Sequence, residues 1–123
     1  MPAIHLSVLY IGSKSEKVLD TCFDETISLS RINGVLLDEI DLPKKLGRPR
    51  NIHLGDQDFS AEYVVCLDFY INDILLSDEF LLVPQLVEDV VMGGATIRKW
   101  RIKLNFDDNS VYVDPKVARH QLI

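Results

Sequence analysis

The stretch that decides the fold is Val18-Leu19-Asp20-Thr21-Cys22-Phe23-Asp24-Glu25-Thr26-Ile27-Ser28. It places an acidic residue, Asp20, directly after an apolar pair and before a threonine, and a short polar run follows. Upstream, residues 4–10 are rich in branched and aromatic side chains, and Gly12-Ser13-Lys14-Ser15 supplies turn chemistry. The pattern predicts a β-hairpin that delivers Asp20 at a strand end.

The middle of the chain alternates strand patterns with turn patterns. Residues 51–54 and 59–67 flank the turn residues 55–58 and predict a second hairpin. Asn33-Gly34 predicts a turn followed by a short strand, and residues 43–49, which hold two prolines and a glycine, predict an exposed loop. Further strand candidates are residues 69–76, 79–83, 102–106 and 111–113.

Only one stretch has a helical pattern. Residues 95–101 follow Gly93-Gly94 and contain good helix formers over barely two turns. We expect the glycine pair to mark a close-packed helix start. Many short strands with frequent turns and one short late helix are typical of an all-β barrel or sandwich.

Composition and charge exclude several classes of protein. A chain of 123 residues that is 47% apolar fits one compact domain, and 13 basic against 19 acidic residues give a net charge of −6, which disfavours nucleic acid as a partner. The sequence shows no signal-peptide pattern, and its apolar runs are too short to span a bilayer, so we expect a cytoplasmic protein without membrane contact. Both cysteines are expected to be reduced, with Cys66 buried in the apolar run 63–67.

The stretch around Asp20 resembles the active-site segment of retropepsin-like (retroviral-type, clan AA) aspartic proteases, in which two apolar residues precede Asp-Thr-Gly-Ala. Residues 89–97 are similar to a second element of that family, two apolar residues and a glycine that begins the single helix. Residues 98–106 are similar to the helix and strand that close the fold in prokaryotic relatives. The chain thus resembles a prokaryotic-type member with a degenerate motif, Asp20-Thr21-Cys22. The resemblance implies a closed β-barrel domain over residues 1–113, followed by a C-terminal tail over residues 114–123.

The resemblance implies a homodimeric aspartic endopeptidase that acts on a peptide or protein substrate without cofactor or metal. Asp20 of each chain would supply one carboxylate of a dyad that shares one proton, so that one member acts as base toward water and the other as acid. Thr21 would support the dyad by a hydrogen bond across the two-fold axis, with Cys22 beside it. The flap over the substrate would comprise Leu54, Gly55 and Asp56.

The sequence departs from the family where Cys22 and Phe23 replace glycine and alanine, which adds a thiol beside the dyad and a ring beneath it. The alternative is therefore a catalytically degenerate pseudoenzyme, in which these two residues close the cleft and the dimer serves as a binding or assembly module. Asp20 could also be a strand-end carboxylate that caps a turn. Asp20 and Cys22 of two chains could in principle bind zinc, whereas the scattered histidines, His5, His53 and His120, lack metal-ligand spacing.

Overall fold

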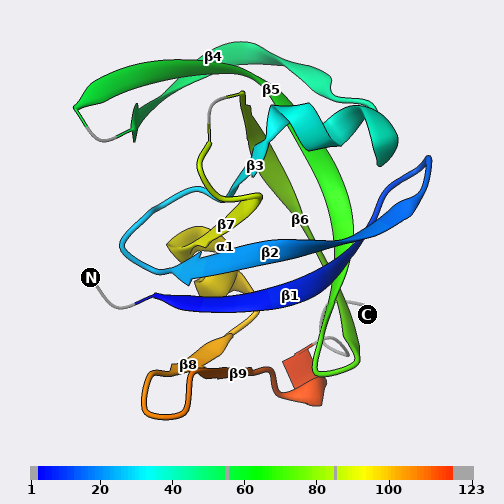
Figure 1. Cartoon of the computed structure of the whole chain (residues 1–123), viewed down its shortest axis with the longest axis vertical. Coiled ribbons are helices and arrows are strands. Elements are labelled where there is room, and N and C mark those ends of the chain that lie inside the picture. Colours follow the sequence, from blue (N-terminus) through cyan, green and yellow to red (C-terminus); the bar gives the residue numbers. More distant parts are fainter. Residues whose placement is uncertain (1–2, 55, 85, 118–123) are drawn as a thin grey trace.

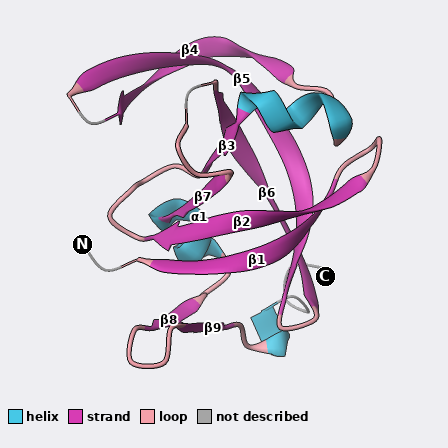
Figure 2. Ribbon diagram, in the orientation of Figure 1, coloured by secondary structure: helices cyan, strands magenta, loops and turns pink. Residues whose placement is uncertain are grey.

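The computed structural model describes residues 3–54, 56–84 and 86–117 (Figures 1 and 2). The strands of these ranges are β1 (Ile4–Ile11), β2 (Glu16–Asp24), β3 (Arg31–Asn33), β4 (Lys44–Leu54), β5 (Gln57–Ile71), β6 (Ile74–Val83), β7 (Val90–Gly93), β8 (Lys103–Asn105) and β9 (Ser110–Tyr112). The labelled helical elements are the 3-10 helix η1 (Gly34–Glu39) and the α-helix α1 (Gly94–Lys99), and residues 115–117 are also helical.

Six strands close into a barrel. They follow the order β1-β2-β7-β3-β6-β5, and β5 pairs back onto β1, with Leu9 opposite Tyr70. β4 extends the sheet beyond β5, and β8 and β9 form a separate two-stranded sheet below the barrel (Figure 1). The expected all-β closed barrel is confirmed, and α1 is the predicted short helix of the C-terminal half; the helical residues 115–117 were not predicted.

β7 occupies the position that brings two distant parts of the sequence together. It lies between β2 and β3, parallel to β2 and antiparallel to β3. Its residues are all buried, as the branched side chains of Val90 and Val91 favour. Thr21 pairs with Val90, so the residues just before α1 lie beside the Asp20 segment.

The glycine pair at the start of α1 is required by close packing. A Cβ atom on Gly93 would lie 2.8 Å from the carbonyl oxygen of Ile27. The N–H of Gly94 donates to that same oxygen at 2.5 Å, and the N–H of Ala95 donates to the oxygen of Ser28 at 2.9 Å. The expected close-packed helix start is confirmed, although α1 ends at Lys99, earlier than predicted.

Three local predictions are wrong. The strand candidates 69–76 and 79–83 do not match the strands, because β5 runs to Ile71 and β6 begins at Ile74, so the turn lies at residues 72–73. Asn33-Gly34 is followed by the helix η1 instead of a strand, because the side-chain oxygen of Asn33 accepts the N–H of Val35 at 3.1 Å and turns the chain. Of the predicted loop at 43–49, all residues after Pro43 belong to β4, whose pairing with β5 is irregular between Lys45 and Arg50. β4 borders only β5 in this sheet, so the missing N–H of Pro49 is tolerated at the irregularity.

Two apolar clusters hold the structure together. The main cluster fills the barrel, where the rings of Tyr10, Phe69 and Phe80 lie 5.8–5.9 Å apart, centroid to centroid. The second cluster attaches the β4–β5 hairpin to the barrel and comprises Ile52, Ala61, Val64, Leu81 and Val83.

The main core extends beyond the predicted domain boundary, because Val117 packs into it. Residues 118–123 lie outside the described ranges, so the division at residue 113 stays a prediction. Within the described ranges, no helix is both long enough and apolar enough to cross a membrane.

Candidate active site

Asp20 lies in the middle of β2. The prediction that it lies at a strand end is therefore wrong. The strand continues past it because residues 21–24 pair with β7 on one side and residues 4–6 of β1 cover the other. Leu19 and Thr21 point into the core, so Asp20 points outward, where its side chain is exposed.

Two side chains that sequence analysis did not identify contact Asp20. The hydroxyl of Ser7, the residue opposite on β1, donates to Oδ1 of Asp20 at 3.4 Å. The backbone N–H of Asp20 donates to Oδ2 of Asp89 at 3.3 Å. Asp89 directly precedes β7, so a second carboxylate lies beside the candidate catalytic residue within the same chain. Only the pairing of β2 with β7 reveals this neighbour.

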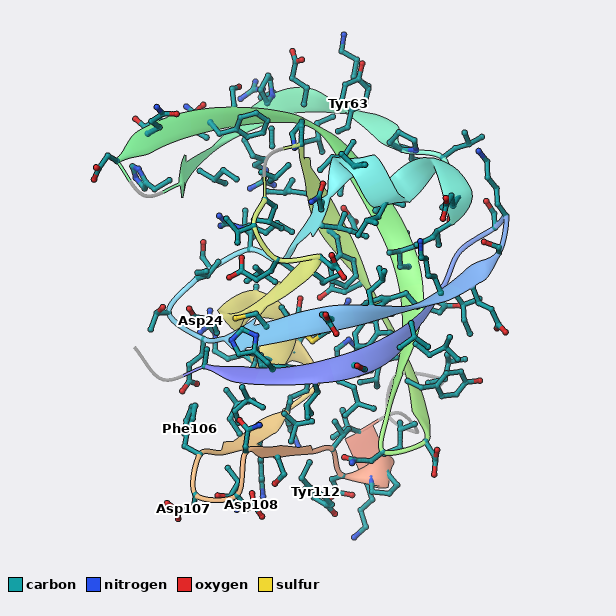
Figure 3. All side chains as sticks on the ribbon, in the orientation of Figure 1. Asp24, Tyr63, Phe106, Asp107, Asp108 and Tyr112 are labelled. Atoms are coloured by element: carbon teal, nitrogen blue, oxygen red, sulfur yellow. The ribbon has the colours of Figure 1, made fainter. Side chains whose placement is uncertain are left out.

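The turn-capping alternative is wrong for Asp20 and describes Asp24 instead. Oδ1 of Asp24 accepts the backbone N–H of Thr26 at 3.0 Å and its hydroxyl at 2.6 Å. Figure 3 shows Asp24 at the end of β2, where the chain turns away from the barrel. The carboxylate of Asp20 is therefore not needed to terminate the strand.

Thr21 is fully buried, as expected, and its hydroxyl has partners within its own chain. It lies 2.8 Å from the hydroxyl of Tyr10 and donates to the carbonyl oxygen of Leu19 at 3.3 Å. With the Thr21 hydrogen directed at Leu19, the Tyr10 hydroxyl donates to Thr21. Burial raises the pKa of Tyr10, so it stays protonated and able to donate. A bond from Thr21 across a two-fold axis would require this pair to rearrange, and that contact stays a prediction.

Replacing Thr21 by valine is expected to lower the free energy of unfolding by about 1–3 kcal/mol, because the buried Tyr10 hydroxyl loses its acceptor. Adding Tyr10→Phe should restore part of this loss, since the double variant leaves no unpaired hydroxyl. Urea unfolding of the four proteins measures the coupling. Strictly additive losses would mean that the two hydroxyls do not interact.

Cys22 lies on the same face of β2 as Asp20 and is buried. Burial, together with the carboxylates of Glu88 and Asp24, raises the pKa of its thiol to about 11. Both cysteines are free, as expected. Cys66, however, is exposed and not buried, because it is on the outer face of β5 opposite Glu79, while Val65 and Leu67 face the core.

Ionisation of the Cys22 thiol is expected to lower the stability of the fold at alkaline pH. Because its pKa is raised from 9.0 to about 11 on folding, the unfolded chain releases this proton first, and stability falls as the pH rises from 9 to 11. We expect the urea midpoint to decline less over this range in Cys22→Ala than in the wild type. Cys66→Ala is the matched control and should keep most of the decline. Parallel curves for all three proteins would contradict this prediction.

Phe23 does not border the face on which the proposed dyad lies. Its ring is fully buried in the main core, on the opposite face of β2 from Asp20. The expectation that Phe23 helps to close the cleft is therefore wrong, because strand alternation turns its side chain inward. Of the two departures from the family motif, only Cys22 borders the site.

The proposed flap is part of a long hairpin that arches over the top of the barrel in Figure 1. β4 ends at Leu54, Asp56 is an exposed turn residue, and Gly55 lies outside the described ranges. Below the tip, Nδ1 of His53 lies 2.5 Å from Oδ1 of Asp58. The hairpin is present as predicted, and its action as a flap stays a prediction.

A buried cation that sequence analysis missed ties this hairpin to the barrel. Arg31 on β3 donates to the carbonyl oxygens of Leu29 at 3.3 Å and His53 at 3.4 Å. Burial lowers the pKa of its guanidinium. Across the described residues, no group of three His, Cys, Asp or Glu side chains is arranged to hold a metal ion. A zinc site shared by two chains stays untested.

The comparisons with known proteins bear on the fold. No family model matches the chain, and no curated protein sequence matches it either. Among solved structures, it is similar to the retroviral protease-like domain of Ddi1 from Leishmania major, with a TM-score of 0.64 and 10% identity over 93% of this chain and 90% of that one. It also matches Lpg0085, a protein of unknown function from Legionella pneumophila, with a TM-score of 0.46 and 13% identity over 75% of this chain and 83% of that one. The first similarity shows that the barrel has a retroviral protease-like fold.

Proposed function

We propose that this chain is one half of a homodimeric aspartic endopeptidase, in which the Asp20 carboxylates of two copies form the catalytic dyad. The observation that carries the proposal is the exposed Asp20 side chain on the outer face of β2, within a barrel of retroviral protease-like fold. The chain holds one such motif, and in this proposal a second copy supplies the second acid.

In the proposed mechanism, one carboxylate of the pair is ionised and the other carries the shared proton. The ionised member takes a proton from water as the water oxygen attacks the peptide carbonyl carbon, and the protonated member donates its proton to the carbonyl oxygen. Breakdown of the tetrahedral species cleaves the C–N bond: the amine leaves with the proton that the first carboxylate took from water, and a hydroxyl of the diol returns its proton to the second carboxylate, which restores the dyad. The tip of the β4–β5 hairpin, Leu54, Gly55 and Asp56, would close over the substrate. We further propose a cytoplasmic location, which suits two free thiols.

The proposal is tested by incubating the wild-type protein at micromolar concentration with a peptide library across the acid and neutral pH range. Cleavage is expected to be greatest at acid to mildly acidic pH, where the pair carries one proton, and to fall as both carboxylates ionise. A pepstatin-type inhibitor should block it. Cleavage that peaks above neutral pH, or that this inhibitor leaves untouched, would reject the mechanism.

A second candidate function, a dimeric binding or assembly module without catalysis, is favoured by two observations. The hydroxyl of Thr21 bonds to Tyr10 in its own chain, and the Cys22 side chain occupies the face that carries Asp20. Cys22→Gly distinguishes the candidates, because it removes the added side chain without disturbing the core. For a pseudoenzyme whose cleft Cys22 has closed, the variant should gain peptide cleavage that the wild type lacks. An active wild type would leave this candidate without support.

A further inference from the structure

Four apolar side chains form a continuous row on the outside of the barrel, where β1 and β2 cross β5. The pairing places Val18 of β2 opposite Leu9 of β1, Leu9 opposite Tyr70 of β5, and Tyr70 opposite Leu75 of β6. Directly paired residues point to the same face of a sheet, so the four side chains lie on one line about 14 Å long across four strands. We call this set the outer row.

The outer row faces away from the core. Val18, Tyr70 and Leu75 are 59%, 39% and 48% exposed, and Leu9 is half-buried without packing against either apolar cluster. Their neighbours along each strand, such as Leu19, Phe69 and Leu76, are the ones that point inward. Single exposed apolar side chains are ordinary, whereas four in register across four strands form a contiguous patch of the kind that binds other molecules.

Acidic side chains border one side of the outer row, and the candidate active site borders the other. The next outward positions on β2 and β5 in one direction hold Glu16 and Asp68, and both are exposed. In the other direction along β2 the next outward residue is Asp20, which the proposed dimer places in the active site, so Glu16 and Asp68 are the rim carboxylates open to a docked segment. An apolar centre with a charged rim is the usual anatomy of a protein interface, and a rim of carboxylates attracts cations and repels acidic partners.

A pocket adjoins the row at Tyr70. Its volume is about 280 Å³, and it lies between β1, β5 and β9, where Leu6, Tyr70 and Val111 contribute to its lining. Asn72, in the β5–β6 turn, also lines this pocket. Its side chain donates to the backbone oxygen of Val111 at 3.4 Å and accepts the N–H of Val113 at 2.8 Å. The pocket has both apolar and polar walls and offers space for one anchoring side chain of a bound segment.

We propose that the outer row is a docking surface for a peptide segment of another protein that carries apolar side chains flanked by lysine or arginine. The apolar side chains would cover Val18, Leu9, Tyr70 and Leu75, and the cations would contact the carboxylate rim. The surface does not depend on peptide cleavage. Its affinity should fall with added salt, because the rim charges are exposed.

The proposal is tested by binding of synthetic peptides of about 14 residues to the 15N-labelled full chain, followed by amide chemical shifts and fluorescence anisotropy. A Leu/Lys peptide is expected to shift amides of β1, β2, β5 and β6, and to bind about tenfold more tightly than a Leu/Glu peptide of the same pattern. A Ser/Lys peptide of equal charge should also bind about tenfold more weakly, since it lacks the apolar side chains. Equal binding of the Leu/Lys and Ser/Lys peptides would overturn the proposal, because attraction to the net acidic chain would then explain it.

Matched variants locate the surface. Tyr70→Thr with Leu75→Thr should weaken the Leu/Lys peptide about tenfold, while threonine preserves the strands. The control is Phe106→Thr with Tyr112→Thr in the β8–β9 hairpin at the bottom of Figure 3. These side chains are 45% and 51% exposed, and their removal should leave peptide binding unchanged. The proposal would be overturned if the Tyr70→Thr, Leu75→Thr variant bound the Leu/Lys peptide with the affinity of the wild type. Concentration-dependent self-association that this variant abolishes would also overturn it, because a second copy would then cover the row.

Discussion

Asp20→Asn is expected to lower peptide cleavage by about 10²–10⁴-fold or more, because asparagine can neither accept the proton from water nor hold the proton that the pair shares. The amide has the same shape as the carboxylate, and Asp20 is exposed in a regular strand, so the fold should be retained. The measurement is the initial rate on one peptide from the acid-range library, with wild-type and variant chains at the same dimer concentration. Undiminished cleavage by Asp20→Asn would exclude Asp20 from the chemistry.

Two neighbouring carboxylates provide the controls for this variant. Asp24→Asn should leave cleavage unchanged, because the Asp24 side chain terminates β2 at Thr26 and an amide oxygen can accept the same bonds. Asp89→Asn distinguishes a dyad made by two chains from one made within a chain, since Asp89 accepts the backbone N–H of Asp20. We expect Asp89→Asn to lower the cleavage rate only modestly. A loss as large as that of Asp20→Asn would indicate that Asp89 is the second catalytic acid.

Phe23→Ala is expected to lower the free energy of unfolding by about 3–5 kcal/mol, the usual result of removing a buried ring from a tight core. Phe23 is fully buried in the main cluster and points to the same inner face of β2 as Thr21. Urea unfolding measures the loss, and the exposed Phe106→Ala serves as the matched control with a change within about 0.5 kcal/mol. A loss below about 1 kcal/mol for Phe23→Ala would mean that the ring does not pack in the core.

The expected destabilisation by Phe23→Ala decides which variant should be used to reopen the cleft. Replacing Cys22 and Phe23 together by the family's glycine and alanine would combine a change at the site with a cavity in the core. An inactive double variant would then not distinguish a closed cleft from a destabilised chain. Cys22→Gly by itself is the informative variant, because only the thiol shares a face with Asp20.

The parts of the fold that the sequence predicts are those set by local patterns. The two hairpins follow from alternating apolar residues around Gly12-Ser13 and around residues 55–58, and α1 follows from Gly93-Gly94. The strand β4 through Pro49 was not predictable in this way, because its pairing with β5 overrides the local preference for a loop. The length of β2 likewise depends on β7, which is far away in sequence and supplies a parallel neighbour past Asp20.

The candidate site was predictable only as a motif. Asp20, Thr21 and Cys22 are adjacent in sequence, but alternation along β2 separates them, so that Thr21 faces the core and the other two face outward. The contacts of Asp20 with Ser7 and Asp89 come from strand register and have no signature in the sequence. The hydrogen-bond partner of the Thr21 hydroxyl could not be predicted from the sequence either, because that partner, Tyr10, lies on another strand.

The central claim, that two chains each supply Asp20 to one active site, is tested most directly by mixing subunits. Wild-type and Asp20→Asn chains are combined in equal amounts, exchanged to equilibrium, and compared with the same total amount of wild-type chain. Random pairing leaves about one quarter of the dimers with both Asp20 side chains, so activity should fall to about one quarter. Activity of about one half would mean that each chain carries a complete site of its own, and would contradict the shared dyad.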